Sequence, residues 1–434
     1  MTTSPALSPV AESDRILGLD VARAVALLGI FFVNAVVFGE PFASIMDPGM
    51  PPGQSPLGQA FYWFTMVFCA GKFYPLFSLL FGVGLAIQLG NAKARGRGHV
   101  ALFLRRLLVL GVFGAAHVLL LWPGDVLLIY AAIGLWMLLL APASPRTLLI
   151  VAGVVFTIGL FLGTGFALLG AMAGVGAGGT PTPKPMPELG EAATALERWV
   201  AVLKDWNQGE QYDSRLKTIE IEIMRNGPLA HAAAVRAFNY AFSWVYVIAV
   251  MFWVILPCFC VGAALLKSGF LHGQLKAWRG RFIVLGLAVG LPLNIFAPWA
   301  VQQGHGSLWM AAATVAMSLG GPLMSLMYLS LVLNWVDSGA AAAVARALAR
   351  LGQMGLSGYI LESTLMSAIM LHWGLGQFGS TTWAQRGLYV LGIYAVILII
   401  ANIWMRFFRF GPLEWLWRSL TYLRPQPMVR VAGR

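Results

Sequence analysis

Charged residues are scarce in this chain of 434 residues. Asp, Glu, Lys and Arg make up 11% of it, whereas hydrophobic residues make up 59% and the mean hydropathy is +0.76. Soluble domains carry about 25% charged residues, so the composition excludes an ordinary soluble protein. Apolar runs long enough to cross a bilayer recur along the chain, and the composition therefore predicts an all-α polytopic membrane protein.

Cysteine is also rare, and its three residues, Cys69, Cys258 and Cys260, fall inside apolar runs. A disulfide framework is therefore not expected, and Cys-Phe-Cys within one helix lacks the ligand spacing of a zinc site. No other group of His, Cys and carboxylates has metal-ligand spacing. The glycine-rich segments lack the strand–turn–helix context of a nucleotide-binding loop. We predict no bound metal and no bound cofactor.

About ten apolar runs have the length of a transmembrane helix. They lie near residues 16–38, 58–88, 102–121, 126–141, 147–171, 241–266, 281–299, 307–334, 353–373 and 386–405. The net charge of +12 does not indicate nucleic acid as a partner, because the basic residues gather in alternate loops. The loops between them carry Glu40 and Asp47 or almost no charge. Basic loops mark the cytoplasmic side, so both termini are predicted there.

The chain divides by composition into five parts. They are a disordered cytoplasmic tail (1–14), N-terminal membrane helices with a polar core (15–172), an extracytoplasmic helical loop (173–238), C-terminal membrane helices (239–410) and a cytoplasmic interfacial helix with a basic tail (411–434). The extracytoplasmic loop is too small for an independent domain and is predicted to form a helical cap. The Trp/Leu/Tyr face and arginines after residue 411 are typical of a helix at the membrane interface.

The hairpin at residues 105–130 carries the costliest polar groups. It begins with Arg105 and Arg106, continues with an apolar run that contains His117, and turns at Trp122-Pro-Gly-Asp125. A polar side chain at membrane depth costs about 2.5–3.5 kcal/mol, so by default it marks a site. A carboxylate close to the histidine would orient the imidazole as a general base requires. The alternative is a helix contact made by His117, with Asp125 directed outward by the proline.

The first apolar run carries a polar stripe. Asp20 and Arg23 are three residues apart and can pair on one face. Asn34 lies eleven residues beyond Arg23 and returns to that face about 16 Å further along. The stripe either seats this helix against its neighbours through an ion pair or lines a substrate cavity.

Two further ionisable residues lie within apolar runs. Lys72 is near the middle of the long second run, where Pro75 is expected to kink the helix. Glu362 lies near the centre of the ninth run, with Tyr359 one turn before it. A buried ion requires a counter-charge or water, so we expect Glu362 to contact Lys72 or Arg23. A shorter helix with Lys72 at the membrane interface is the alternative.

Five stretches together resemble one protein family. They are LDVARAVALLGIFFVN, GKFYPLFSLLFGVGL, the hairpin RR–HVLLLWPGD, GQMGLSGYILES and GPLEWLWRSLTY. In this order they resemble the bacterial inner-membrane proteins with the domain of unknown function 418, the YeiB-like family. The resemblance covers both ends of the chain, and it implies a multi-pass protein of the bacterial inner membrane.

That family is thought to be related to membrane acyltransferases, including the acyltransferase-3 and heparan-glucosaminide acetyltransferase groups. The tie lies in the first helix, where the family pattern appears as Asp20, Arg23 and Asn34. Ala24 stands where the acyltransferases have glycine, and Asn34 stands where acyltransferase-3 proteins have histidine. Asparagine cannot act as a general base near neutral pH, which leaves His117 as the best candidate.

Two hypotheses follow. In the first, the protein is an acyltransferase that moves an acyl group from a cytoplasmic donor, with acyl-CoA as co-substrate, to a lipid or glycan acceptor. His117 and Asp125 are then catalytic. The residues expected to bind substrate are Asp20, Arg23, Asn34, Lys72, Arg105, Arg106, Trp122, Tyr359 and Glu362. In the second, the protein is a transporter or flippase whose polar path runs through Asp20, Arg23, Lys72 and Glu362. A structural partner of another membrane enzyme is a third alternative.

Overall fold

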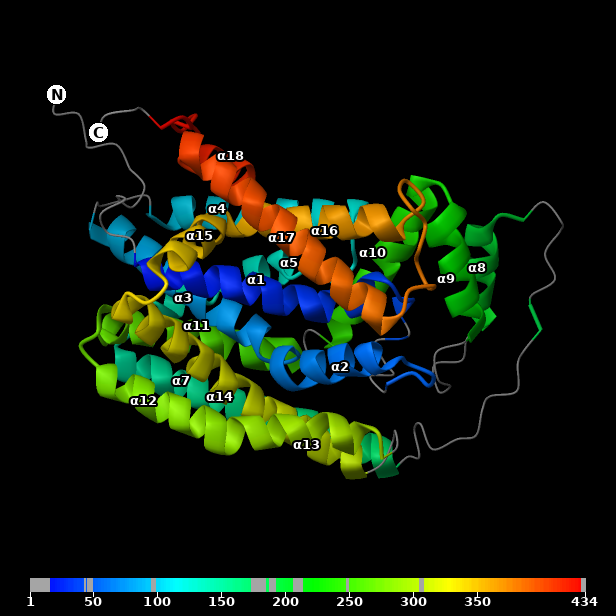
Figure 1. Ribbon diagram of the computed structural model, residues 1–434, viewed down its shortest axis with the longest axis horizontal. Coiled ribbons are helices and arrows are strands. Elements are labelled where there is room, and N and C mark those ends of the chain that lie inside the picture. Colours follow the sequence, from blue (N-terminus) through cyan, green and yellow to red (C-terminus); the bar gives the residue numbers. More distant parts are fainter. Residues whose placement is uncertain are drawn as a thin grey trace.

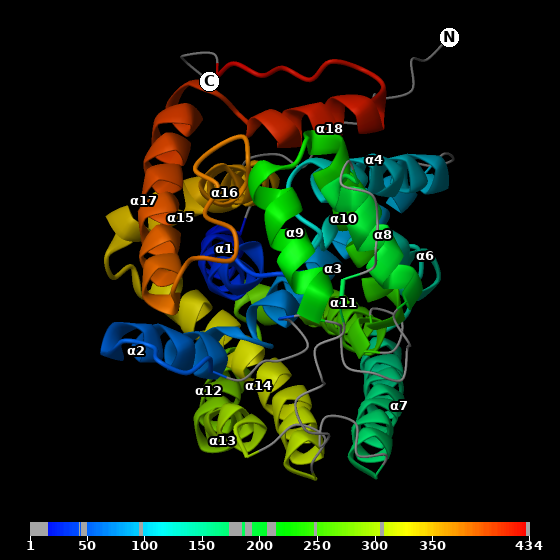
Figure 2. The ribbon, with the colours of Figure 1, turned by 90° about the vertical axis from the view of Figure 1, so that its right-hand side faces the viewer.

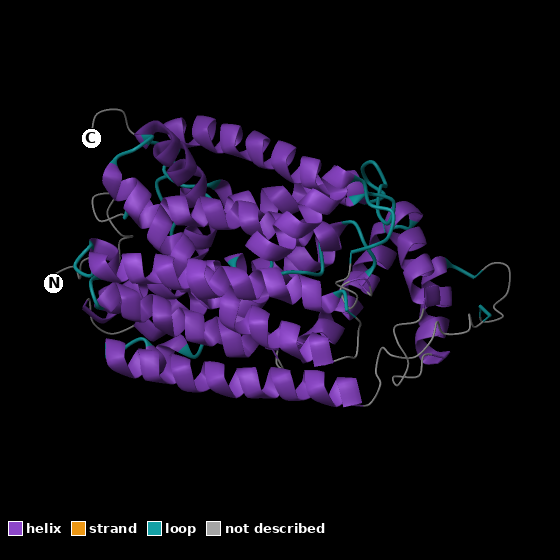
Figure 3. Ribbon diagram, turned by 60° about the horizontal axis from the view of Figure 1, so that its bottom comes forward, coloured by secondary structure: helices purple, strands orange, loops and turns teal. Residues whose placement is uncertain are grey.

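The computed structural model describes residues 16–42, 44, 50–94, 99–172, 185–186, 193–205, 214–246, 250–303 and 308–430. Within these residues the regular structure is helical, apart from one isolated bridge between Phe408 and Val429 (Figure 3). This confirms the all-α fold predicted from composition. The predicted tail at 1–14 and most of the Gly/Pro-rich segment at 173–190 lie outside the described residues.

Many of the helices are long and several are interrupted. In chain order they are α1 (Leu17–Phe38), α2 (Pro56–Phe64), the π-helical turn η3 (Thr65–Cys69), α3 (Phe73–Ala94), α4 (His99–Leu120), α5 (Leu127–Gly134), α6 (Met137–Leu140), α7 (Pro145–Met172), α8 (Ala195–Asp205), α9 (Ser214–Asn226), α10 (Leu229–Tyr246), α11 (Phe252–Lys267), the 3-10 turn η5 (Phe270–His272), α12 (Lys276–Leu285), the π-helical turn η6 (Gly286–Gly290), α13 (Leu291–Val301), α14 (Leu308–Ser338), α15 (Ala342–Gln353), α16 (Gly355–Met370), α17 (Trp383–Phe407) and α18 (Pro412–Tyr422).

Seven helical segments in the described part of the chain are long and apolar enough to cross a membrane, compared with about ten predicted. The predicted run at 126–141 is divided between the short helices α5 and α6. The run at 353–373 is covered by α16, which spans 16 residues because the chain turns at Met354 and becomes extended at Leu371. Helix α11 likewise has 16 residues. Hydropathy alone does not register these interruptions.

Helix α1 is the centre of the molecule. Figure 2 looks along it and shows α3, α14, α15, α16 and α17 around it, and all five pack against it. The helix carries alanines at Ala22, Ala24 and Ala26, and small residues let neighbouring backbones approach closely. Because Gly29 has no side chain, the ring of Phe73 can pack directly against the backbone of α1 at this position. The small residues of α1 therefore explain why so many helices fit around it.

Helices α7, α12 and α13 form an outer layer along one side (bottom of Figure 1). Their outward side chains are large and apolar, as at Phe161, Leu169 and Val284, of which Phe161 is 72% exposed. In water such a surface would be unfavourable, whereas it matches lipid tails. This layer supports the membrane-embedded class inferred from composition.

The long second run breaks earlier than Pro75. Helix α2 widens into the π-helical turn η3, the chain turns at Gly71 with a φ of +79°, and α3 begins at Phe73. Pro75 therefore lies in the first turn of α3, where its missing N–H leaves no hydrogen bond unmade. The expected kink at this proline is wrong, because the glycine two positions before α3 takes up the change of direction.

The two ends of the bundle differ. At one end, on the right in Figure 1, α8, α9 and α10 cover the bundle; we call it the loop end. Helices α8 and α9 are those expected in the 173–238 loop, and they pack through buried Trp199, Leu216 and Ile219. At the other end, on the left, lie the start of α1 and helix α18; we call it the basic end. Helix α18 packs on α4 and α16.

Candidate active site

His117 and Asp125 meet in space. His117 is on the last turn of α4, and the chain reverses at residues 122–124 to bring Asp125 back against it. Nδ1 of His117 lies 2.9 Å from Oδ2 of Asp125, and both side chains are fully buried. The other carboxylate oxygen, Oδ1, accepts the N–H of Leu128 at 2.8 Å in the first turn of α5. The hydrogen bond expected from the sequence is present, and the carboxylate is held from both sides.

The second nitrogen of His117 is available. Nε2 is buried and has no hydrogen-bond partner among the described residues. The ring centroid of Tyr359 lies 5.0 Å from that of His117, and the ring of Trp122 lies 6.4 Å away. Trp122 stacks in turn on Phe38, with centroids 4.5 Å apart. An imidazole with one nitrogen bound to a carboxylate and the other unoccupied has the arrangement of a general base.

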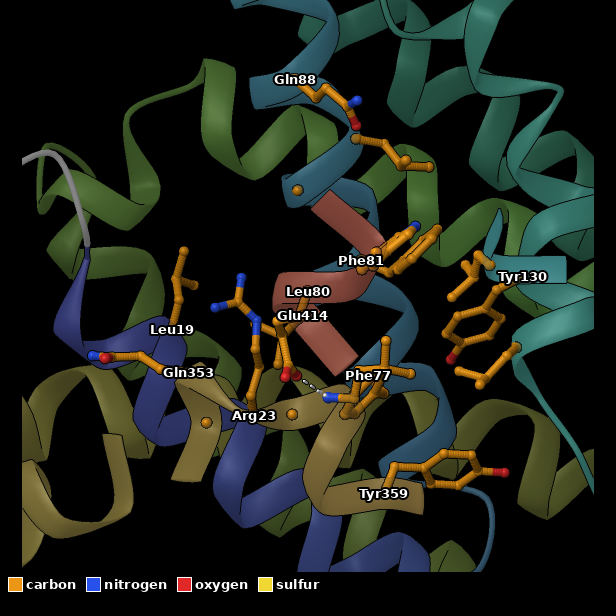
Figure 4. Close-up of a pocket in the computed structure, with 18 of the residues that line it drawn as sticks. Leu19, Arg23, Phe77, Leu80, Phe81, Gln88, Tyr130, Gln353, Tyr359 and Glu414 are labelled. Carbon is orange, nitrogen blue, oxygen red and sulfur yellow. Dashed lines mark hydrogen bonds between the residues drawn. The ribbon is translucent and has the colours of Figure 1, made fainter. Parts of the chain in front are cut away.

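A cavity of about 330 Å³ lies next to this pair. It is lined by α1, α3, α4, α5, α15, α16 and α18, and Tyr359 belongs both to its wall and to the surroundings of His117. Figure 4 shows Arg23, Gln353, Tyr130 and Tyr359 around this space. Val126 also lines it and directly follows Asp125. One aromatic ring therefore lies between the cavity and the imidazole.

Charged groups of the cavity lie toward the basic end. Arg23 donates to Asp20 at 2.5 Å, and both line the cavity. Arg106 stacks over the ring of Trp417 at 3.9 Å. Glu414 accepts hydrogen bonds from the N–H groups of residues 356 and 357 and from the Ser357 hydroxyl, so it closes the start of α16. The polar stripe of α1 thus faces a cavity at Asp20 and Arg23.

Five of the nine predicted substrate-binding residues lie outside the cavity lining: Asn34, Lys72, Arg105, Trp122 and Glu362. Arg105 does not line the cavity, and its guanidinium donates to the carbonyl of residue 421 at 2.9 Å, which ties α4 to α18. Asn34 is half-buried near the far end of α1, outside the lining. Lys72 is fully buried, and its Nζ donates to the Met66 carbonyl at 2.7 Å. The ammonium of Lys72 therefore satisfies a carbonyl at the end of η3, where the helix dipole is negative.

Glu362 lies one turn beyond Tyr359 on α16, buried and outside the cavity lining. In the part of the chain that the structure describes, no Lys or Arg lies within 4.0 Å of its carboxylate, and Oε1 has no hydrogen-bond partner. The expected ion pair with Lys72 or Arg23 is absent at that distance, because each of those cations has another acceptor. A protonated carboxyl suits this apolar setting.

Sequence reasoning missed the contribution of α18. Glu414, Trp417 and Arg418 all line the cavity. They are spaced at i, i+3 and i+4, so they share one face of that helix, and this periodicity was the available signal. The sequence predicts an interfacial position for α18, and the structure adds that one of its faces lines the cavity at the basic end.

A second, much smaller cavity of about 20 Å³ lies on the loop-end side of Trp122. It has room for one water molecule. Glu220 of α9 lines it and is buried; its carboxylate accepts the N–H of Phe42 at 3.2 Å and Nδ2 of Asn239 at 3.1 Å. Burial raises the pKa of Glu220 to about 8, although the hydrogen bonds from Phe42 and Asn239 act in the opposite direction.

Glu220 should make the stability of the folded chain depend on pH. Between its ordinary pKa of 4.5 and its folded pKa of about 8, the folded state holds a proton that the unfolded state has released. The free energy of unfolding should therefore fall as pH rises through this interval, by up to about 1.4 kcal/mol per pH unit. Glu220→Gln should flatten this decline in thermal denaturation of the purified protein, whereas Glu222→Gln on the same helix should not. A decline of equal slope in Glu220→Gln would contradict this.

Among the described residues no group of three or more His, Cys, Asp and Glu side chains is arranged to hold a metal ion. Cys69, Cys258 and Cys260 are free thiols in the buried interior. The site offers a buried His–Asp pair, three tyrosines and a group of arginines.

Residues 265–424 match the family described as "Protein of unknown function (DUF418)". The chain is 29% identical to the protein YxaH of Bacillus subtilis (strain 168) over 442 residues, which cover 98% of both chains. It is 28% identical to YeiB of Escherichia coli (strain K12) over 429 residues, which cover 97% of this chain and 100% of YeiB. Both relatives are described as uncharacterized. No solved structure matches the chain significantly.

The family match in the C-terminal part agrees with the near full-length similarity to these two bacterial proteins. The helical architecture, with seven helices of membrane-spanning length among the described residues, agrees with the composition. The chain is therefore a multi-pass membrane protein that is similar to the DUF418 family in its C-terminal part and to YxaH and YeiB over nearly its whole length.

Proposed function

We propose that this protein is a membrane acyltransferase of the bacterial inner membrane. One observation carries the proposal: the buried pair of His117 and Asp125 lies one aromatic ring away from a cavity of about 330 Å³. The basic end faces the cytoplasm by the positive-inside rule. The acyl donor then enters the cavity from the cytoplasm, and acyl-CoA is the proposed co-substrate. The acceptor is a hydroxyl or amine of a lipid or glycan.

The proposed reaction is a general-base-assisted acyl transfer. Nε2 of His117 takes the proton of the acceptor hydroxyl or amine, and the acceptor atom attacks the carbonyl carbon of the acyl group. The bond from this carbon to the leaving thiolate breaks as the tetrahedral intermediate collapses, and the imidazolium returns the proton to the thiolate. Asp125 holds the imidazole in one tautomer and stabilises its positive form.

The transporter hypothesis has less support in the arrangement of side chains. It requires Asp20, Arg23, Lys72 and Glu362 to line one path, but Lys72 and Glu362 do not line the cavity. A catalytic pair beside a cavity requires no such path. We therefore favour group transfer, in which Lys72 and Asn34 take no part.

The proposal is tested by filling the cavity. Gly84 lines it, and a side chain added there would meet no atom within 4 Å. Gly84→Phe should therefore leave the fold intact and lower the rate of acyl transfer about tenfold or more, because the ring occupies the donor's space. The assay follows label from radioactive acetyl-CoA into lipid and glycan fractions of proteoliposomes that contain the full chain and bacterial lipid.

The matched control is Gly90→Phe on the same helix, where the added side chain also meets nothing within 4 Å and Gly90 is not in the cavity wall. It should retain the wild-type rate. Wild-type protein that transfers no label, or Gly84→Phe that transfers it at the wild-type rate, would count against donor entry through this cavity.

A further inference from the structure

Three arginines converge on the basic end of the cavity. Arg23 from α1, Arg106 from α4 and Arg418 from α18 all line it. The guanidinium of Arg106 lies within electrostatic range of both other arginines. Its Nε is buried and has no hydrogen-bond partner in the described residues, and its planar face rests on Trp417. Like charges gathered at a half-buried position repel each other unless an anion joins them.

Among the described residues, no carboxylate of the cavity wall pairs with Arg106. Two carboxylates line the cavity, Asp20 and Glu414, against the three arginines. Asp20 is engaged by Arg23. Glu414 is engaged by the first backbone N–H groups of α16 and by the Ser357 hydroxyl, and burial raises its pKa, which favours the neutral acid. The Arg106 guanidinium therefore has no carboxylate partner in the described part of the chain, and it lies on a wall that faces an open space.

Much of the rest of the cavity wall is apolar. Leu27, Ile30 and Leu110 line it at least one helical turn further from the basic end than Arg23 and Arg106, and Phe77 and Phe81 line it from α3. Such a wall suits an acyl or alkyl chain. The cavity therefore has a cationic part at the basic end and an apolar part that reaches Tyr359 and, behind it, His117.

We propose that this arginine cluster (Arg23, Arg106 and Arg418) binds the phosphate of an anionic amphiphile whose apolar chain extends toward Tyr359. Guanidinium groups pair with phosphate through parallel charge-assisted hydrogen bonds. The inference deepens the proposed function, because it names the ligand class of the same cavity, but binding does not require that transfer occurs. Two sources share this chemistry: a phosphate-bearing acyl carrier from the cytoplasm, or an anionic phospholipid of the inner leaflet.

The test measures binding to the purified full-length protein in nanodiscs. The probes are radiolabelled coenzyme A in neutral phosphatidylcholine discs and, in a second arm, spin-labelled phosphatidylglycerol added to the same discs. Arg106→Gln and Arg418→Gln should each weaken binding about tenfold or more, since each removes a charge-assisted hydrogen bond. The control, Arg346→Gln, alters an exposed arginine of α15 outside the cavity and should leave binding unchanged.

The two arms identify the source. Arginine-dependent binding of coenzyme A assigns the cluster to a soluble carrier, and arginine-dependent binding of phosphatidylglycerol alone assigns it to the lipid. Arg106→Lys keeps the charge and should recover part of the affinity, and thermal denaturation checks the fold of each variant. Binding of both probes that is insensitive to Arg106→Gln and Arg418→Gln in folded protein, or no binding of either probe to wild type, overturns the inference. His117→Gln should bind normally, so loss of turnover alone overturns only the proposed function.

Discussion

Replacing His117 with alanine should lower the rate of acyl transfer by about 10²–10⁴-fold, the usual contribution of a general base. Nε2 of His117 is the buried basic nitrogen that the structure leaves unpartnered beside the cavity, and its orientation depends on the 2.9 Å hydrogen bond to Asp125. Without the imidazole, the proposed proton acceptor of the reaction is lost. The measurement is transfer of label from radioactive acetyl-CoA in proteoliposomes.

A second variant separates catalysis from folding. His117→Ala leaves the buried carboxylate of Asp125 with one hydrogen bond fewer, which costs about 1–3 kcal/mol. His117→Gln offers an amide N–H to Asp125 but has no basic nitrogen, so it should fold like the wild type and be equally inactive. Asp125→Asn should also lower the rate, because an amide favours the wrong imidazole tautomer.

The matched control is His272→Ala, which alters an exposed histidine of η5 at a distance from the cavity wall. It should keep the wild-type rate. Retention of full activity by folded His117→Gln would rule out His117 as the base.

Gly82→Val should prevent the bundle from packing. A side chain at Gly82 would lie 2.3 Å from the backbone oxygen of Phe259 on α11, and one at Gly262 would lie 2.1 Å from that of Leu79 on α3. The two glycines thus let the α3 and α11 backbones touch, and backbone atoms cannot rotate away as a flexible side chain does. We expect destabilisation of about 3 kcal/mol, at the upper end for an overpacked interior.

The measurement is the yield of monodisperse protein in detergent together with its midpoint of thermal denaturation. Gly90→Val is the control on the same helix, since its added side chain meets nothing within 4 Å. Gly82→Val that elutes and melts like Gly90→Val would show that α3 and α11 are not held at this distance in the membrane protein.

Features that depend on neighbours in sequence were predictable. The pairing of Asp20 with Arg23 follows from their spacing of three residues on one helix. The hydrogen bond between His117 and Asp125 spans a single short turn. The sequence therefore left one question undecided: whether this turn directs the carboxylate toward His117 or outward. Pro75 was misjudged because Gly71, with its positive φ, takes up the bend before the helix starts.

Features that depend on helix packing were not predictable in this way. The sequence predicted an ion pair between Glu362 and either Lys72 or Arg23, because an unpaired ionised side chain is unfavourable within the membrane. In the structure Lys72 donates to the Met66 carbonyl of the preceding turn η3, and no Lys or Arg lies within 4.0 Å of Glu362 among the described residues. Hydropathy predicts that a side chain is buried, but it does not predict which other side chain or backbone group that side chain contacts.

By itself the sequence determined that this is a helical membrane protein, because apolar runs of this length are stable only as helices in lipid. It also predicted the Asp20–Arg23 pair from helix spacing, whereas the structure decided between the two directions that the sequence left open for Asp125. Only the tertiary structure decided which arginines share a cavity: Arg23, Arg106 and Arg418 come from three helices distant along the chain. Their meeting depends on the packing of α18 against α4 and α16; the periodicity of α18 indicates which of its faces packs, but not which helices that face meets.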